Sequence, residues 1–189
     1  MAPPKKFTKE EIIQVAFEIA RREGLDAITI RKVAKELGSS IAPIYVNFSN
    51  VDELIEAVVR RAEEVAKQLV LEQNSGQPFR DIGIGGIKFA RKYSVLYRDL
   101  MLKDNPHVEH NEEKFTFAVN QMKQDPALQG FSDEELKEII LKMDIFHTGL
   151  MVQVANGLFP KDISDEQLIA MLDSVAKDIV IAAKVKKEM

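Results

Sequence analysis

The stretch TIRKVAKELGSSIAPIYVNFSN, from Thr29 to Asn50, decides the fold. Its pattern predicts a short helix up to Leu37, an interruption at Gly38, a still shorter helix, and a third helix that opens at Asn50. Helices this short are marginal in water because nucleation is costly, so both must pack on another element. Two short helices joined by a tight turn and packed on a preceding helix describe a helix-turn-helix.

Each residue of this unit has an expected structural role. Gly38 lets the chain turn tightly, and Ser40 is predicted to cap the second helix by accepting a hydrogen bond from a free backbone N–H. Pro43 then falls in the first turn, where its missing N–H is not needed. Ile44 and Phe48 are predicted to point inward. The inner face of the first helix is predicted to consist of Ile30, Val33, Ala34 and Leu37.

The rest of the chain also predicts helices. The first begins with a capping box of Thr8 and Glu11 and stops at Gly24. A long helix at 51–73 is capped by Asn50 with Glu53, and the break NSGQP follows at 74–78. Further helices are expected at about 79–92, 94–103, 112–124, 133–157 and 165–184. We predict an all-α protein of about nine helices, with a helix-turn-helix domain at 1–50, the connecting helix at 51–73, and a second domain at 74–189.

Composition narrows the classes of protein. Hydrophobic residues make up 46% of the 189 residues and charged residues 30%, as in ordinary globular domains. The absence of cysteine excludes disulfides and thiolate sites. No apolar run is long enough to span a bilayer, so no membrane partner is expected. The opening MAPPKKF has no apolar stretch behind its lysines, so it is not a secretory signal and a cytoplasmic location is expected.

Charge is unevenly distributed along the chain. Residues 1–50 carry 8 Lys or Arg against 6 Asp or Glu, whereas residues 51–189 carry 18 against 24. A mildly basic head on an acidic body fits a partner with phosphates at one end. Chance variation of surface charge is the alternative.

The segment IIQVAFEIARREGLDAITIRKVAKELGSSIAPIYVNFSNVDEL resembles the DNA-binding domain of the tetracycline-repressor (TetR) family. The matching residues are Ile12, Ala16, Gly24, Thr29, Ile30, Arg31, Ala34, Leu37, Gly38, Ile44, Tyr45, Phe48, Asn50 and Leu54. The resemblance implies a homodimeric transcriptional regulator, usually a repressor, whose C-terminal domain binds a small-molecule effector that releases it from a DNA operator. Asn47 stands where the family usually has His, and Val51 where it commonly has a Lys that touches phosphate.

The resemblance also implies contacts to double-stranded DNA. Thr29, Ser40 and Tyr45 are phosphate candidates, and Arg31 is placed to reach a base edge, where Arg pairs well with guanine. Ser39, Ile41, Ala42 and Pro43 are expected to line the groove face, a set poor in donors that suits thymine methyls, and Asn47 completes the predicted DNA-binding residues. Lys5, Lys6 and Lys9 form a basic arm. The alternatives are helix caps for Thr29 and Ser40, and a solvated face for Arg31.

The second domain leaves more alternatives open. Gly83, Gly85 and Gly86 interrupt a helical pattern, which indicates either close helix packing or space for a ligand. Polar and soft side chains within apolar helices are core residues or line a site for a mostly apolar effector; the residues predicted for that site are Phe89, Tyr93, Tyr97, Asn120, His147 and Met151. His107 and His110 could share a helix face as metal ligands, but Pro106 favours an exposed loop, so no metal is predicted.

Three function classes compete. The amphipathic helices at 133–157 and 165–184 cover the domain core or, as the resemblance implies, join two copies. A ligand-responsive DNA-binding regulator leads, with a non-DNA-binding helical ligand carrier or interaction protein second. An enzyme comes third, because no catalytic constellation and no cofactor fingerprint stands out.

Overall fold

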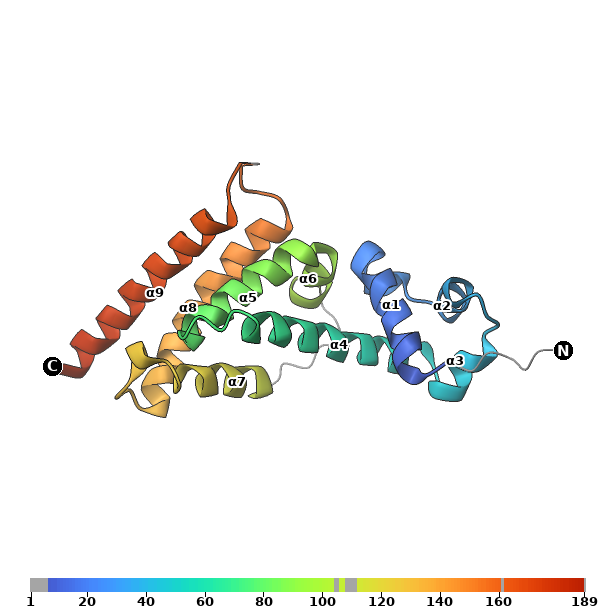
Figure 1. The fold of residues 1–189 in the computed structure, drawn as a ribbon, viewed down its shortest axis with the longest axis horizontal. Coiled ribbons are helices and arrows are strands. Elements are labelled where there is room, and N and C mark those ends of the chain that lie inside the picture. The colour runs from blue at the N-terminus through green and yellow to red at the C-terminus, as the bar shows by residue number, and fades with distance from the viewer. Residues whose placement is uncertain (1–6, 104–105, 108–111, 161, 189) are drawn as a thin grey trace. The chain divides into compact units, whose positions relative to one another are not determined.

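The computed structural model describes residues 7–103, 106–107, 112–160 and 162–188. Within these residues the chain forms nine α-helices, two short 3-10 helices and no strand, which confirms the all-α prediction (Figure 1). The elements are α1 (Lys9–Glu23), η1 (Leu25–Ala27), α2 (Ile30–Leu37), α3 (Ala42–Asn47), α4 (Val51–Leu71), α5 (Pro78–Lys92), α6 (Ser94–Met101), α7 (Glu112–Met122), η2 (Pro126–Leu128), α8 (Asp133–Ala155) and α9 (Asp165–Glu188).

The chain divides into two compact units. The first holds residues 1–65 and 93–109, and the second holds 66–92 and 110–189. This division differs from the boundary expected near residue 74, because α4 begins in the first unit and ends in the second, and α6 belongs to the first. The sequence could not reveal that α6 joins the first unit, because the residues that α6 contacts lie far from it along the chain.

The helix-turn-helix forms the core of the first unit, the head. Val33 and Ala34 of α2 and Ile44 and Phe48 at α3 are buried with the apolar face of α1. Gly38 adopts a left-handed conformation with φ of 64°, and the N–H groups of Gly38 and Ser39 donate back to carbonyls of α2. This arrangement ends α2 and turns the chain tightly. The predicted helix-turn-helix geometry is therefore present.

Helix α6 packs on α1 within the head. The rings of Phe17 and Tyr93 meet edge to face, with centroids 5.8 Å apart. A buried Asp99 carboxylate accepts a hydrogen bond from the Leu25 N–H at 2.6 Å. Gly24 has φ of 96°, and an added Cβ there would lie 2.6 Å from Asp99 Oδ2. Asp99 thus ties α6 to the segment that leads into α2.

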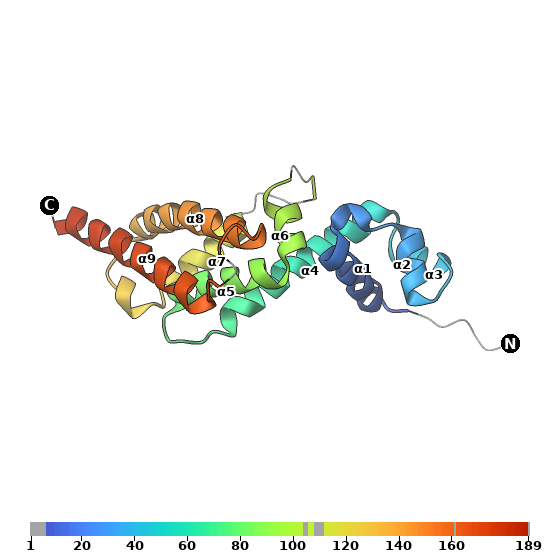
Figure 2. The same ribbon diagram turned by 90° about the horizontal axis from the view of Figure 1, so that it is seen from above.

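In the second unit α5 packs against α7, α8 and α9 (Figure 2). One apolar cluster gathers residues of α7 and α8, and another joins α5, α8 and α9 through Ile87, Met143, Leu150, Leu168 and Leu172. Arg80 of α5 donates to both carboxylate oxygens of Asp173 on α9, at 2.9 and 3.0 Å. Reciprocal capping bonds are present at the start of α8, between Ser132 and Glu135, and at the start of α9, between Ser164 and Gln167.

The three glycines of α5 are explained by close helix packing. An added Cβ at Gly83 would lie 2.2 Å from Leu172 of α9, and one at Gly85 would lie 2.6 Å from Val70 of α4. At Gly86 it would lie 2.3 Å from the His147 ring of α8. Real Cβ atoms do not approach that closely, so each glycine permits one helix contact. The sequence left packing and ligand space open, and the structure favours packing.

Candidate nucleic-acid interface

Helix α3 presents a largely apolar outward face. Ile44 is its one buried residue, whereas Tyr45, Val46 and the N-cap residue Ile41 are exposed, Val46 to 84%. The inward positions Ile44 and Phe48 are four residues apart, which places Val46 between them on the outside of the helix. Val46 was missing from the predicted groove face, although this spacing was there to identify it.

The local geometry around α3 shows the roles of Ser39, Ser40, Pro43 and Asn47. Ser40 does not cap the helix, because Ile41 occupies the N-cap position without any side-chain cap bond. Pro43 lies in the first turn, as predicted. The Ser39 hydroxyl donates to the Ser40 carbonyl at 2.9 Å, and Asn47 Nδ2 donates to the Pro43 carbonyl at 2.9 Å. The expected cap at Ser40 was wrong, and the Ser40 residue is exposed.

Thr29 caps α2 and keeps a donor for another partner. Its hydroxyl oxygen accepts a hydrogen bond from the Lys32 N–H at 3.2 Å. A hydroxyl has one donor and two acceptor lone pairs, so the O–H of Thr29 can still donate. Thr29 is exposed. Capping and phosphate contact, posed as alternatives from the sequence, are therefore compatible.

Most cations of the head are already paired with carboxylates. Within the described residues of the head, Lys9, Arg21, Arg22 and Lys32 pair with Glu53, Glu18, Glu36 and Glu23, in that order, at 3.8, 2.8, 2.6 and 2.5 Å. The hydrogen bond from Lys32 lowers the pKa of the Glu23 carboxyl. The side chains of Arg31 and Lys35, both exposed on α2, make no hydrogen bond or ion pair with any described residue.

Arg31 and Lys35 lie four residues apart on one face of α2, so their charges project together. Lys35 was not among the predicted DNA-binding residues, although its spacing from Arg31 was visible in the sequence. Lys5 and Lys6 of the predicted basic arm lie outside the described residues.

The start of α4 is negatively charged. Asn50 Oδ1 accepts from the Glu53 N–H at 2.8 Å, and Glu53 accepts from the Ser49 N–H at 2.8 Å. That backbone hydrogen bond lowers the pKa of Glu53 and keeps it ionised. Asp52 adds a second carboxylate in the same turn. The position where Val51 replaces the expected Lys therefore offers little attraction for a phosphate.

Comparison with known proteins shows what the helix-turn-helix segment and the whole fold are similar to. The model described as "Bacterial regulatory proteins, tetR family" matches residues 12–58, from α1 into α4. A TetR transcriptional regulator from Streptomyces coelicolor shares the fold with a TM-score of 0.70 at 17% identity, over 93% of this chain and 98% of that one. The helix-turn-helix segment thus matches the tetR family, and the chain shares the fold of a TetR regulator.

The names of two curated relatives describe transcriptional repressors. The HTH-type nicotine-responsive transcriptional repressor HdnoR of Paenarthrobacter nicotinovorans is 36% identical over 62 residues, which is 33% of this chain and 30% of that protein. The HTH-type transcriptional repressor DrrR1 of Streptomyces coeruleorubidus is 25% identical over 161 residues, or 78% and 53% of the two chains. The chain thus spans about half or less of these relatives' lengths.

The predicted effector-site residues do not form one group within either unit. Tyr93 and Tyr97 are buried in the head, whereas Phe89, His147 and Met151 are buried in the second unit. His147 and Met151 meet at Gly86 of α5. Asn120 is exposed on α7, away from the buried residues. The assignment of these six residues to an effector site remains a prediction.

His147 has a packing role that its sequence context did not reveal. The ring lies on Gly86, and Nε2 is 3.0 Å from the Gly83 carbonyl oxygen, which can only accept. Burial lowers the pKa of His147, because the charged ring would have to leave water. The neutral ring therefore donates its Nε2–H to α5.

Acidification is expected to destabilise the protein through His147. A histidine with a lowered pKa binds fewer protons folded than unfolded, so the free energy of unfolding falls as the pH drops through the unfolded value of 6.5. The slope should approach about 1.4 kcal/mol per pH unit. Urea unfolding between about pH 7 and pH 5 measures it. This pH dependence should vanish in His147→Gln and persist in the control His107→Gln. Equal slopes in the wild type and both variants would contradict the assignment of the pH dependence to His147.

The structure also bears on a metal site and on a membrane-spanning helix. Within the part of the chain that the structure describes, no three His, Asp or Glu side chains gather closely enough to hold a metal ion. His110, one of the two histidines considered as metal ligands, lies outside the described residues. No described helix has the length and apolar character needed to cross a membrane.

Proposed function

We propose that the protein is a homodimeric repressor that acts in the cytoplasm, binds a palindromic DNA operator through α2 and α3, and is released by a small, largely apolar effector. The observation that carries the DNA-binding surface is the pair Arg31 and Lys35. In a head where Lys9, Arg21, Arg22 and Lys32 are paired with carboxylates, these two side chains are exposed and unpaired on α2, the helix that precedes α3. Unpaired cations attract phosphates, and Arg31 can also reach guanine.

Hydroxyl groups support the same surface. Thr29, Ser40 and Tyr45 are all exposed around α2 and α3. Such groups donate to phosphate oxygens and fix the position of a protein on the duplex without reading sequence. The donors proposed for positioning and the two unpaired cations thus belong to the same short helices.

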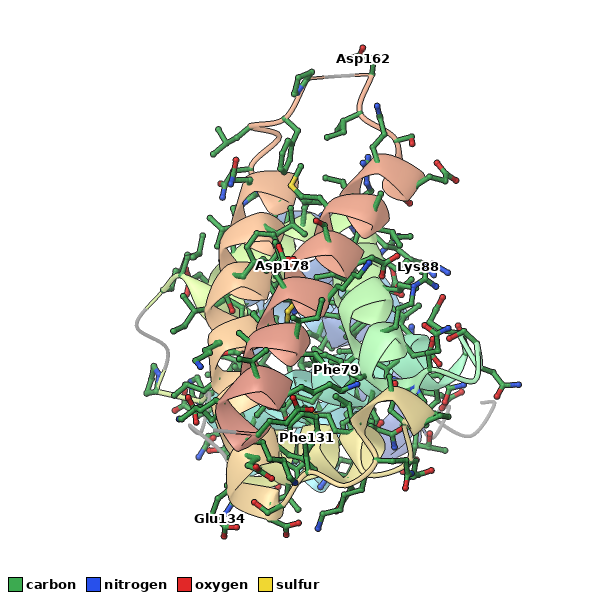
Figure 3. The ribbon with its side chains drawn as sticks, turned by 90° about the vertical axis from the view of Figure 1, so that its left-hand side faces the viewer. Phe79, Lys88, Phe131, Glu134, Asp162 and Asp178 are labelled. Carbon is green, nitrogen blue, oxygen red and sulfur yellow. The ribbon has the colours of Figure 1, made fainter. Side chains whose placement is uncertain are left out.

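Features of α8 and α9 support the dimer. Figure 3 shows these helices side by side, with Glu134 at the start of α8 and Asp178 on α9. Within its 24 residues α9 fully buries just Leu168 and Leu172, while Met171, Ile181 and Val185 are exposed. Leu141 and Ile145 of α8 are also exposed, Ile145 to 69%. Large exposed apolar surface marks an interaction site.

Gly149 continues the exposed stripe of Leu141 and Ile145 at intervals of four residues. Nothing lies within 4 Å of the place where its Cβ would be, unlike the three glycines of α5. A glycine inside a helix costs about 1 kcal/mol relative to alanine. We propose that α8 of a second copy crosses closely at Gly149.

The effector is supported by the relative HdnoR, whose name calls it nicotine-responsive. We propose for this chain an effector of the same general kind, a small molecule with more apolar surface than polar groups. Of the six predicted residues, Phe89, His147 and Met151 are buried in the second unit and are the ones proposed to contact it.

Substitutions at Arg31, Lys35 and Tyr45 test the DNA-binding surface. Each loss of a phosphate-contacting cation should reduce the slope of log affinity against log salt by about one, so Arg31→Ala and Lys35→Ala should each do so on random DNA. If Arg31 contacts guanine instead, its loss should act mainly on the preferred site. Tyr45→Phe removes one hydrogen bond to a charged group, so binding should weaken by about 1.5–3 kcal/mol on all sequences without a change of slope.

Fluorescence anisotropy on a site selected from random duplex DNA, and on a scrambled duplex, measures these effects at several salt concentrations. Arg21→Ala is the matched control, because Arg21 already pairs with Glu18. Its affinity should equal that of the wild type. Binding that is unchanged in Arg31→Ala, Lys35→Ala and Tyr45→Phe, with all three folded, would place the DNA elsewhere and favour a ligand carrier or interaction protein.

A further inference from the structure

The hydrogen-bonding capacity of α3 toward bases is small. Its groove face carries no Arg, Lys or Gln, the residues that make most paired hydrogen bonds to base edges. The half-buried Asn47 amide is turned back onto its own helix by the 2.9 Å bond to the Pro43 carbonyl. Ser39 likewise spends its hydroxyl proton on the Ser40 carbonyl. The hydroxyls of Ser40 and Tyr45 and the second amide N–H of Asn47 remain as donors.

Apolar groups dominate what α3 exposes. Ala42 and Val46 lie four residues apart, and so do Ile41 and Tyr45, which gives two neighbouring rows along the outward face. Val46 is the most exposed large hydrophobic residue of the described chain. No packing within the head accounts for it, because Ile44 and Phe48 supply the buried contacts. The exposed rows therefore need an apolar partner.

The major groove offers one apolar group, the C5-methyl of thymine. Resting on the proposed function, we propose that α3 reads its operator chiefly through thymine methyl groups, with Val46 and Ala42 as the specificity-determining residues. Arg31 of α2 supplies the charged contact beside them. The preferred half-site therefore contains at least one thymine whose methyl group packs on Val46.

Deoxyuridine substitution tests this directly. Deoxyuridine pairs with adenine as thymidine does and lacks just the methyl group. After selection of a preferred site from random duplex DNA, each thymidine of one half-site is replaced in turn, and affinity is measured at fixed salt. Burying one carbon group corresponds to about a threefold to fivefold change in affinity. We expect such a loss at one or two positions per half-site, and about tenfold or more when both half-sites are changed.

Variants assign the effect to a residue. At the base position that Val46 contacts, the Val46→Ala variant should bind the thymidine and deoxyuridine sites with almost equal affinity. Because Val46 is exposed, this substitution leaves the core unchanged. Arg31→Ala is the matched control: it should weaken binding to both sites and keep their ratio. At a position where cytosine replaces thymine, 5-methylcytosine should recover part of the lost affinity, since it restores the methyl group in the groove.

The outcomes separate this inference from the proposed function. Equal affinity for thymidine and deoxyuridine at every position, with tight binding that Arg31→Ala weakens, would overturn methyl recognition and leave DNA binding intact. A thymidine preference that survives Val46→Ala unchanged would overturn the assignment to Val46. If the wild type selects no sequence and binds no duplex even at low salt, the proposed function fails, and with it the inference.

Discussion

Asp99→Ala is expected to lower the free energy of unfolding of the head by about 1–4 kcal/mol. Asp99 is 4% exposed, and its carboxylate accepts the buried Leu25 N–H at 2.6 Å while it pairs with Lys103 at 2.9 Å. Removing the carboxylate leaves a buried donor without its acceptor, which costs about 1–3 kcal/mol. The half-exposed Lys103 adds up to about 1 kcal/mol, because solvent screens that pair.

Asp26→Ala is the matched control for Asp99→Ala. Asp26 also pairs with Lys103, at 2.8 Å, but its side chain is 86% exposed. Both carboxylates together raise the pKa of Lys103 to about 12, yet the loss of Asp26 should change stability by less than about 1 kcal/mol. Asp99→Asn keeps an oxygen for the Leu25 N–H and should lie between the two.

Urea unfolding combined with hydrogen exchange at the Leu25 amide measures this prediction. The amide should exchange faster in Asp99→Ala than in Asp26→Ala. Because η1 leads into α2, which carries Thr29 and Arg31, DNA affinity should fall along with stability. Equal stability of the two alanine variants would contradict the role assigned to Asp99.

Gly149→Leu is expected to dissociate the proposed dimer while the protomer stays folded. No atom of its own chain lies within 4 Å of a Cβ added at Gly149, and the leucine side chain would stand between the two proposed copies of α8. Overpacking costs about 1–3 kcal/mol at each site, and the two-fold axis doubles it. The dimer dissociation constant should therefore rise by about thirtyfold or more.

Sedimentation equilibrium measures that constant, and circular dichroism checks the fold. Gln68→Leu is the control, because it adds a leucine to an exposed position of α4 instead of α8 or α9. This variant should remain as dimeric as the wild type. A dimer of unchanged affinity in Gly149→Leu would show that α8 does not cross its partner there.

Much of the fold could be predicted because its signals are local. The capping pair Thr8 and Glu11, the turn at Gly38 and the inward spacing of Ile44 and Phe48 each act within a few residues, and all three are found in the structure. The exception was Ser40, since the chain reaches helical geometry at Ile41 without using a side-chain cap.

Features that depend on distant partners could not be predicted. The bond between Asp99 and Leu25 joins residues 74 positions apart. The neighbours of Gly83, Gly85 and Gly86 come from three other helices, so the sequence could not distinguish packing from ligand space. Likewise, Lys35 stands out because nearby cations pair with carboxylates of another helix, as Arg22 does with Glu36 and Lys32 does with Glu23.

Hydroxyl-radical footprinting on a site selected from random duplex DNA tests most directly whether the protein binds DNA as a two-fold dimer through α2 and α3. We predict two protected half-sites related by two-fold symmetry, with centres separated by about 10 base pairs or a multiple of that. The protection should disappear in the double variant Arg31→Ala with Lys35→Ala. A footprint without symmetry, or one that the double variant reproduces in full, would contradict the proposal that the protein binds DNA as a two-fold dimer through α2 and α3.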